Sequence, residues 1–318
     1  MTDFCTLFDS NYLTRGLAMY ESLKAQCTEF HLYVCAFDDT SYEILTRLRL
    51  PHVTVIPLRE IEHARLLAVK PTRTRGEYCW TCTSHVIQHV IDTFGLPEVT
   101  YVDADLCFYA NPALLLEEFK LAGASVLLTE HRYTPAYDMS RQSGLYCVQF
   151  MTFKADERGL AALAWWQERC LEWCYNRVED GKFGDQKYLD DWTSRFDGVH
   201  VLRHPGGGVA PWNVQQYRIE LGDGRVAANG VPLVFYHFHD YKFYEDGSHY
   251  LGKYLLEKKI IELLYRPYVL ALQRAKDAVR TVCPDFNAGA SQKVRKLTTP
   301  FWNLMNRLKG TYNVYSSL

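Results

Sequence analysis

The sequence predicts a globular α/β fold, on the evidence of three observations. β-rich and helical patterns alternate through the first hundred of its 318 residues, hydrophobic residues make up 48% and charged residues 23%, and no internal repeat is present. This composition is typical of a folded domain rather than a disordered chain. A β-α-β-α-β order predicts parallel strands with crossover helices, whose ligands bind beyond the carboxyl ends of the strands.

The amino-terminal part of the chain contains the elements that establish this order. Buried strands are expected at residues 2–9, 31–37 and 53–58. After the first strand, Asn11 and Thr14 offer turn and N-cap chemistry, so a helix is expected to follow. Its apolar stripe consists of Leu13, Leu17, Tyr20 and Leu23. A polar turn at residues 38–40 begins a second, shorter helix.

The alternation continues until the composition turns basic. Further strands are expected at residues 99–108, 125–129, 144–153 and 233–238, and helices at 77–94, 155–174 and from 254 to about 276. Between Arg266 and Lys309, nine Lys or Arg residues stand against only Asp277 and Asp285. We therefore expect a main domain over residues 1–255 and a basic helical extension over residues 256–318.

Charge and cysteine usage exclude some classes of function. The net charge is −2 and the excess basic residues are confined to the tail, so no nucleic acid partner is expected. The Cys79–Cys82 pair has no second pair at zinc spacing nearby. The amino terminus does not resemble a secretory signal, and no stretch approaches the roughly 18 apolar residues of a membrane span. We expect a cytoplasmic protein with free thiols.

Two carboxylates, Asp103 and Asp105, follow the apolar residues of the strand expected at 99–108. Two residues apart on a strand, they would lie on one face and repel each other, which is costly unless a cation compensates. Hard oxygen ligands of this kind suit Mg²⁺ or Mn²⁺, which then bridges a substrate diphosphate. The alternative is a pair of solvated loop acids. Their position directly after a buried strand favours the metal site.

A second polar group follows the strand expected at 233–238. His237 and His239 lie on one face of that strand end and offer nitrogen ligands, and Lys242 offers a cation for a phosphate. The alternative is a histidine satisfied within the core and a lysine at the surface.

Two further segments have residues suited to a sugar site. Asp185 and Gln186 could orient an acceptor or stabilise positive charge at a sugar's reacting carbon, and Asp185 could also cap the next helix. Residues 204–208 form a Gly-rich loop without the Walker or Gly-x-Gly-x-x-Gly pattern. We expect a flexible active-site loop there rather than a phosphate cradle.

Taken in order, these segments resemble the retaining GT-A glycosyltransferases of the glycogenin and lipopolysaccharide-galactosyltransferase type, glycosyltransferase family 8 and its relatives. The resemblance spans roughly residues 3–245. The matching segments are residues 6–13 (opening strand and base-binding loop), 101–105 (metal motif), Ser143-Gly144 (acceptor-side strand), 184–186 (Asp-Gln element) and 237–242 (His-x-x-Gly-x-x-Lys-Pro-Trp element). The chain departs from the last pattern, since Asp240 replaces the Gly, Lys242 comes one residue early and no Pro-Trp follows. Gln142 stands where the family has Asn.

The resemblance implies a GT-A fold, a Rossmann-like mixed sheet flanked by helices, with a helical carboxyl-terminal extension. It implies transfer of a sugar from a nucleotide-diphosphate sugar, with a UDP-sugar favoured, to a hydroxyl of a glycan or lipid-linked saccharide, with Mn²⁺ or Mg²⁺ and with retention. The implied metal ligands are Asp103, Asp105 and His237, with His239 as a substitute. The implied donor contacts are Phe8, Asp9 and Tyr12 around the base, Asp103 at the ribose, Lys242 at the diphosphate, and Arg73, Arg75 or Lys70 near the phosphates or donor sugar. Asp185 and Gln186 are expected near the acceptor and the anomeric carbon.

Two other functions are consistent with parts of the pattern. A sugar nucleotidyltransferase would use a similar domain and a carboxylate-bound metal, but residues 9–15 lack the early Gly-rich phosphate loop of that class. A non-catalytic carbohydrate-binding protein could keep a degenerate transferase fold, but the intact Asp103 and Asp105 argue against it.

The basic tail ends in an amphipathic pattern. Thr299-Pro300 is typical of an N-cap followed by Pro at the first helical position. The apolar stripe consists of Phe301, Leu304, Met305 and Leu308, and the nearby basic residues are Lys293, Arg295, Lys296, Arg307 and Lys309. Such a helix suits the surface of an anionic membrane, and it would equally suit packing on its own domain.

Overall fold

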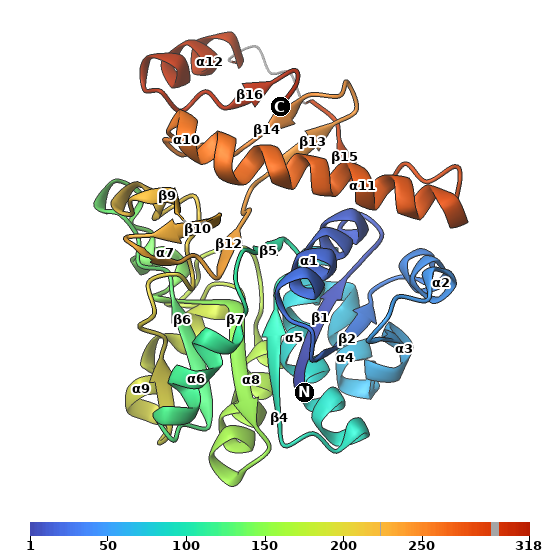
Figure 1. Cartoon of the computed structure of the whole chain (residues 1–318). Helices are drawn as coiled ribbons and strands as arrows, with labels where there is room; N and C mark the ends of the chain where they lie inside the picture. The colour runs from blue at the N-terminus through green and yellow to red at the C-terminus, as the bar shows by residue number, and fades with distance from the viewer. Residues whose placement is uncertain (223, 294–298) are drawn as a thin grey trace.

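The computed structural model describes residues 1–222, 224–293 and 299–318. Its centre is a seven-stranded sheet in the order β3-β2-β1-β4-β7-β6-β8 (Figure 1). The strands are β1 (Thr2–Phe8), β2 (Phe30–Ala36), β3 (Val53–Pro57), β4 (Glu98–Val102), β6 (Val126–Glu130), β7 (Tyr146–Lys154) and β8 (Val199–Val201). Strands β3, β2, β1 and β4 are parallel, whereas β7 runs antiparallel to β4 and β6. The predicted α/β fold with parallel amino-terminal strands is confirmed.

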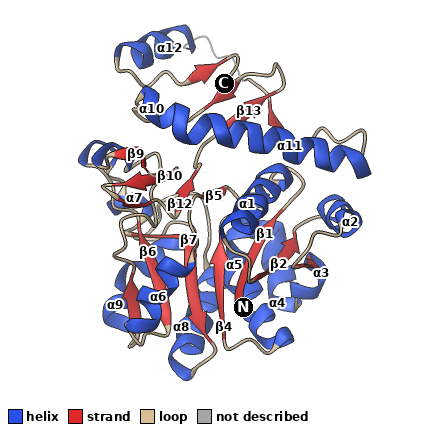
Figure 2. Cartoon of the chain, viewed as in Figure 1, coloured by secondary structure: helices blue, strands red, loops and turns tan. Residues whose placement is uncertain are grey.

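Helices cover both faces of this sheet, and alternation along the strands supplies each face with side chains (Figure 2). In β1, Phe4 and Phe8 belong to the core formed with α1, α6 and α11 (Arg266–Val282), whereas Cys5 and Leu7 belong to the core formed with α5 and α8. The helices of this domain are α1 (Leu13–Gln26), α2 (Asp39–Leu48), α3 (Leu58–Ile61), α4 (Ala64–Val69), α5 (Arg75–Phe94), α6 (Ala113–Leu121), α7 (Ser140–Ser143), α8 (Glu157–Glu172) and α9 (Trp192–Arg195).

The starts of the helices follow capping chemistry, with one difference from expectation. Asp38 forms a capping box with Ser41 at the start of α2. Neither Asn11 nor Thr14 caps α1, whose cap residue is Tyr12 and has no side-chain cap. The carboxylate of Asp9 instead accepts hydrogen bonds from the backbone nitrogens of Asn11 and Tyr12. A side chain from the end of β1 thus satisfies the turn that leads into α1.

The strand expected at residues 99–108 is two strands separated by a turn. Strand β4 ends at Val102, and β5 (Leu106–Phe108) pairs antiparallel with β12 (Phe235–His237). In the turn, the backbone nitrogen of Leu106 donates to the carbonyl of Asp103 at 3.3 Å. The apolar residues continue on both sides of the turn, so the pattern does not reveal the break.

The carboxyl-terminal part packs against the central domain rather than standing apart. Helix α11 (Arg266–Val282) lies beside α1 (Figure 1), and its residues Ala275 and Val279 are buried in the same core as Phe4. A four-stranded sheet, ordered β15-β13-β14-β16, lies on the other side of α11. The remaining elements are β9 (Ile219–Gly222), β10 (Arg225–Ala228), β11 (Val231–Pro232), β13 (Lys242–Tyr244), β14 (His249–Tyr250), α10 (Lys258–Ile260), a π-helical turn (Ile261–Tyr265), β15 (Ala290–Ser291), α12 (Thr299–Leu308) and β16 (Val314–Tyr315).

Two features expected of the tail are its boundary with the main domain and its basic residues. The division of the chain between residues 255 and 256 stays a prediction, and Arg295 and Lys296 lie outside the described residues. None of the helices within the described ranges has the length and apolarity needed to cross a bilayer.

Candidate metal and donor site

The largest cluster of predicted site residues lies where the strand order switches. From β1 the chain adds β2 and β3 on one side and later β4 on the other, so the carboxyl ends of β1 and β4 diverge into a crevice. A cavity of about 710 Å³ opens there. The predicted site residues that line it are Phe8, Asp9, Tyr12, Arg75, Asp103, Asp105, Ser143, Asp185, Gln186, His237 and His239.

Asp103, Asp105 and His237 converge within the cavity. One donor atom from each lies within 4.8 Å of the others. The Nε2 atom of His237 is 3.1 Å from Asp105 Oδ1 and 3.9 Å from Asp103 Oδ2. The two carboxylates lie on the turn between β4 and β5, and do not alternate along one strand as expected. Pairing of β5 with β12 then sets His237 opposite Leu106, next to Asp105.

Gln149 orients His237, and the sequence analysis missed it. Gln149 lies on β7, is fully buried, and accepts a hydrogen bond from Nδ1 of His237 at 2.7 Å. Its backbone carbonyl also accepts from the backbone nitrogen of Asp103. With Nδ1 engaged, Nε2 of His237 is the nitrogen left for the carboxylates or a metal. No spacing signal marks Gln149, because it sits inside a continuously buried strand.

The charges of this cluster perturb one another strongly. Burial raises the pKa of Asp103 to about 6. Burial would also raise the pKa of Asp105, but the neighbouring His237 overrides it and lowers the value to about 2. Burial alone would lower the pKa of His237, yet Asp105 and Asp103 raise it well above its ordinary value. The imidazolium thus supplies positive charge that the two carboxylates require, which is the role a bound cation would take over.

Asp9, which lines the cavity, holds the turn after β1. It accepts from the side chain of Asn11 at 3.1 Å and pairs with Arg75 at 2.9 Å. Arg75 also lies 3.6 Å from Asp38, so it bridges the ends of β1 and β2. Phe8 and Tyr12 line the same cavity.

Asp185 also lines the cavity, and neighbouring groups fix its backbone. Gly184 precedes it with φ of +53°, and the Asp185 carbonyl accepts from the indole of the buried Trp166 at 2.9 Å. The short helix after it (Gln186–Asp191) receives no side-chain cap from Asp185, so the expected capping role is wrong. Burial, and then the charge of Asp103, raises the pKa of Asp185 to about 8. Gln186 donates to the carbonyl of Ser143 at 2.6 Å.

His239 and Trp212 also line the cavity. The ring of His239 lies 5.8 Å from that of His237 and 5.2 Å from that of Trp212. Burial first, and then the charges of His237 and Lys253, lower the pKa of His239 to about 4. Lys253, which the sequence analysis did not select, lines the cavity beside these rings.

Three predicted donor contacts, Lys242, Arg73 and Lys70, do not line this cavity. Lys242 is 46% exposed and pairs with Asp240 at 3.1 Å. Arg73 lies over the ring of Tyr175 at 3.8 Å. None of the three is among the described residues that surround the cavity.

The Gly-rich loop is a packed turn rather than the flexible loop expected. Gly206, Gly207 and Gly208 are buried. A Cβ at Gly206 would meet the carbonyl oxygen of Pro232 at 2.0 Å, so only glycine allows this approach.

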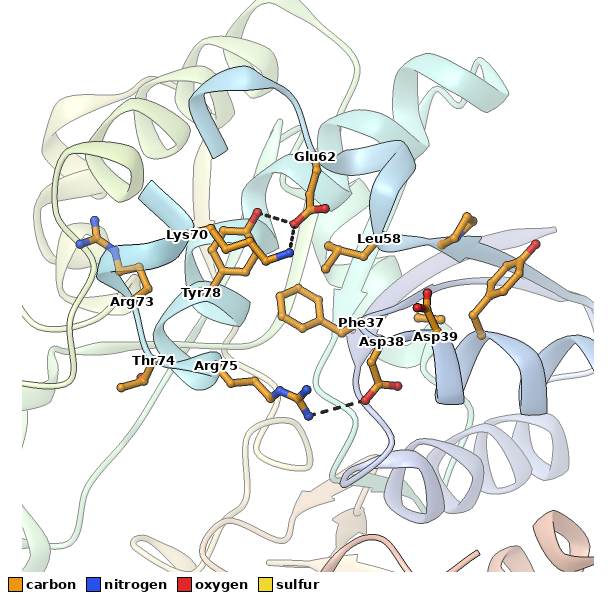
Figure 3. A pocket seen from close by; sticks show the side chains of 13 residues that line it. Phe37, Asp38, Asp39, Leu58, Glu62, Lys70, Arg73, Thr74, Arg75 and Tyr78 are labelled. Atoms are coloured by element: carbon orange, nitrogen blue, oxygen red, sulfur yellow. Dashed lines mark hydrogen bonds and ion pairs between the residues drawn. The ribbon is translucent and has the colours of Figure 1, made fainter. Parts of the chain in front are cut away.

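A second cavity of about 470 Å³ adjoins the first and shares Phe37 and Arg75 with it (Figure 3). In it, Glu62 accepts hydrogen bonds from Lys70 at 2.5 Å and from Tyr78 at 2.9 Å. The Arg73 side chain points away from these groups. Lys70 is therefore engaged with Glu62 rather than directed at the metal cluster.

Sequence comparisons match this chain to relatives from Bacillus subtilis. No protein-family model matches the chain. The uncharacterized protein YfnD of Bacillus subtilis (strain 168) is 32% identical over 292 residues, which cover 90% of this chain and 93% of YfnD. YfnF of the same organism is 32% identical over 304 residues, which cover 92% and 99%.

Among solved structures, the galactosyltransferase LgtC in complex with donor and acceptor sugar analogues matches with a TM-score of 0.56 at 11% identity, over 86% of this chain and 96% of LgtC. An active-site mutant of LgtC matches with a TM-score of 0.52 at 10% identity, over the same shares. The predicted GT-A fold, a mixed sheet flanked by helices with a helical carboxyl-terminal region, is confirmed.

Proposed function

This chain belongs to the family of YfnD and YfnF, and we propose that it is a metal-dependent glycosyltransferase that uses a nucleotide-diphosphate sugar, with a UDP-sugar favoured. One observation carries the proposal. Two carboxylates and an imidazole, with donor atoms within 4.8 Å, converge at the strand switch point of a GT-A fold. The adjoining cavity of about 710 Å³ is of the size that small-molecule and cofactor sites have. We further propose that the enzyme resembles glycosyltransferase family 8.

The donor set fits Mn²⁺ or Mg²⁺. Carboxylate oxygens suit both ions, and an imidazole nitrogen favours Mn²⁺ over Mg²⁺. Asp103, Asp105 and His237 would hold the ion, with His239 as a substitute. When bound, the ion would neutralise the charge that develops on the departing nucleoside diphosphate.

The nucleotide base is proposed to lie beside Asp9 in the cavity. Phe8 and Tyr12 supply aromatic lining surface, and Asp9 supplies hydrogen-bond acceptors beside Arg75. Asp103 would also contact the ribose. Arg75, and not Arg73, is the arginine that lines the cavity.

The reacting sugar is proposed to lie near Asp185 and Gln186. Because the pKa of Asp185 is about 8, its carboxyl carries a proton at neutral pH and can donate a hydrogen bond to a sugar oxygen. Gln186 is held by Ser143, which fixes its direction at the acceptor side. An acceptor hydroxyl would attack on the face that the diphosphate leaves, and the product would retain its anomeric configuration.

The acceptor is proposed to be a glycan or lipid-linked saccharide, reached from a membrane surface. On α12, Leu304 is 58% and Leu308 74% exposed, and Arg307 and Lys309 are exposed near them. Apolar side chains beside basic ones suit an anionic lipid surface. Attachment there would bring the chain to the surface at which lipid-linked substrates lie.

Proton NMR of the full chain incubated with UDP-, GDP-, CDP- and dTDP-sugars tests the proposal. We expect release or transfer of the sugar from one donor class, with Mn²⁺ or Mg²⁺ and with the anomeric configuration of the donor. Asp105→Ala should abolish this turnover. Equal turnover in EDTA, or an active Asp105→Ala variant, would remove the metal from the proposal, and an inverted product would remove retention.

A further inference from the structure

We infer that Lys253 is the lysine that binds the donor's diphosphate, and that Asn313, near the carboxyl terminus, positions it. This inference rests on the proposed function, because it assigns a residue to the leaving group of that reaction. It also makes the last strand of the chain a structural part of the donor site.

Lys253 and Lys242 differ in what surrounds them. Both lysines are exposed, but Lys253 lines the cavity that contains the metal cluster. Lys242 pairs with Asp240 at 3.1 Å, lies over the ring of Tyr250 at 5.5 Å, and is not among the described residues that line the cavity. A phosphate in the cavity would therefore meet Lys253 first.

The charge balance of the cavity also points to Lys253. Among the described lining residues, Arg75 and Lys253 are the Lys or Arg side chains, whereas the acids are Asp9, Asp103, Asp105 and Asp185. Arg75 is already paired with Asp9 and close to Asp38. A diphosphate brings further negative charge, and Lys253 is the lysine in position to offset it.

Lys253 projects from a segment, residues 251–255, which we call the strap. The strap is held at almost every residue by groups distant in sequence. The hydrogen bonds run from Leu251 N to Asn313 O (3.0 Å), from Asn313 Nδ2 to Gly252 O (3.0 Å) and Tyr254 O (2.6 Å), from Leu255 N to Tyr137 Oη (2.7 Å), and from Gln215 Nε2 to Leu255 O (2.9 Å).

Asn313 is the central member of this set. It is only 3% exposed, and its amide clamps the carbonyls on both sides of Lys253. Directly after it, β16 pairs antiparallel with β14, the strand that leads into the strap. Gly252 has φ of +93°, a conformation that glycine adopts readily and that turns the chain at Lys253. The geometry makes Asn313 a positioning residue rather than a ligand.

Calorimetric binding of UDP, UMP and uridine, each with Mn²⁺, to the full chain tests the inference. We expect Lys253→Ala to weaken UDP binding tenfold or more and uridine binding less than twofold, because only the diphosphate contacts the lysine. Lys253→Arg should recover part of the loss. Asn313→Ala should weaken UDP binding selectively, even though it also lowers the melting temperature.

Two comparison variants separate the alternatives. Lys258→Ala removes an exposed lysine close to the strap and controls for net charge. Lys242→Ala tests the rival assignment and should change UDP affinity less than twofold. Equal UDP affinity in Lys253→Ala and wild type, an equal loss for uridine, or a larger loss in Lys242→Ala would overturn the inference. Wild-type protein that binds none of the three compounds would instead count against the proposed UDP-dependent function.

Discussion

Replacing Asp185 with Asn should stabilise the protein at pH 8. Asp185 is 5% exposed, and burial raises its pKa from 3.8 to about 8. Between these values the native state keeps a proton that the unfolded state releases, so rising pH lowers the free energy of unfolding through this group. About four pH units at about 1.4 kcal/mol each set an upper bound of about 5–6 kcal/mol. After relaxation of the surroundings, we expect about 2–3 kcal/mol to remain at pH 8.

Thermal unfolding of both proteins in EDTA between pH 5 and pH 8 measures this gain. For a chain of this length, 2–3 kcal/mol corresponds to about 3–5 °C at the midpoint. The midpoint of Asp185→Asn should exceed that of wild type at pH 8, and the difference should shrink as the pH falls. Asp138→Asn is a control, since Ser140 lowers the pKa of that exposed carboxyl and no gain is expected. A variant no more stable than wild type at pH 8, with an unchanged pH slope, would refute the reasoning.

The remaining predictions concern the orientation of the metal ligand His237 and the contact of α12 with a membrane. Gln149→Leu should weaken Mn²⁺ affinity roughly 10- to 100-fold in calorimetry, because His237 loses the partner that orients it; an unchanged affinity would show that Gln149 only fills space. Leu304→Asp combined with Leu308→Asp should abolish cosedimentation with anionic phosphatidylglycerol vesicles and leave turnover of soluble substrates intact, whereas unchanged cosedimentation would exclude α12 as the contact.

The α/β fold could be predicted from local patterns, because apolar runs ended by polar turns located β1, β2 and β4. The grouping of Asp103, Asp105 and His237 in one metal site followed from the resemblance to glycosyltransferase family 8, and the three side chains do converge. The route to that convergence was not predicted. The two carboxylates meet through a turn, and the apolar residues on both sides of it read as one strand.

Residues whose roles depend on distant contacts were not predictable. Gln149 acts through a partner 88 positions away, and nothing around it in sequence distinguishes it from core. Lys253 lies in a segment held by Asn313, so its direction depends on a strand near the end of the chain. Arg73 and Arg75 are two residues apart, and the sequence does not show which of them lines the cavity. Helix α5 begins at Arg75, which pairs with Asp9, whereas Arg73 lies over the ring of Tyr175.

The most direct test of the metal-dependent donor site is a thermal-shift panel of UDP, GDP, CDP and dTDP on the wild-type chain, each with Mn²⁺, Mg²⁺ or EDTA. A ligand that binds only the folded state raises its melting temperature by mass action. We predict that one nucleotide raises the melting temperature with Mn²⁺ or Mg²⁺, and that EDTA or Asp105→Ala removes the shift. No shift with any nucleotide, or an equal shift in EDTA, would contradict a metal-dependent site at Asp103, Asp105 and His237.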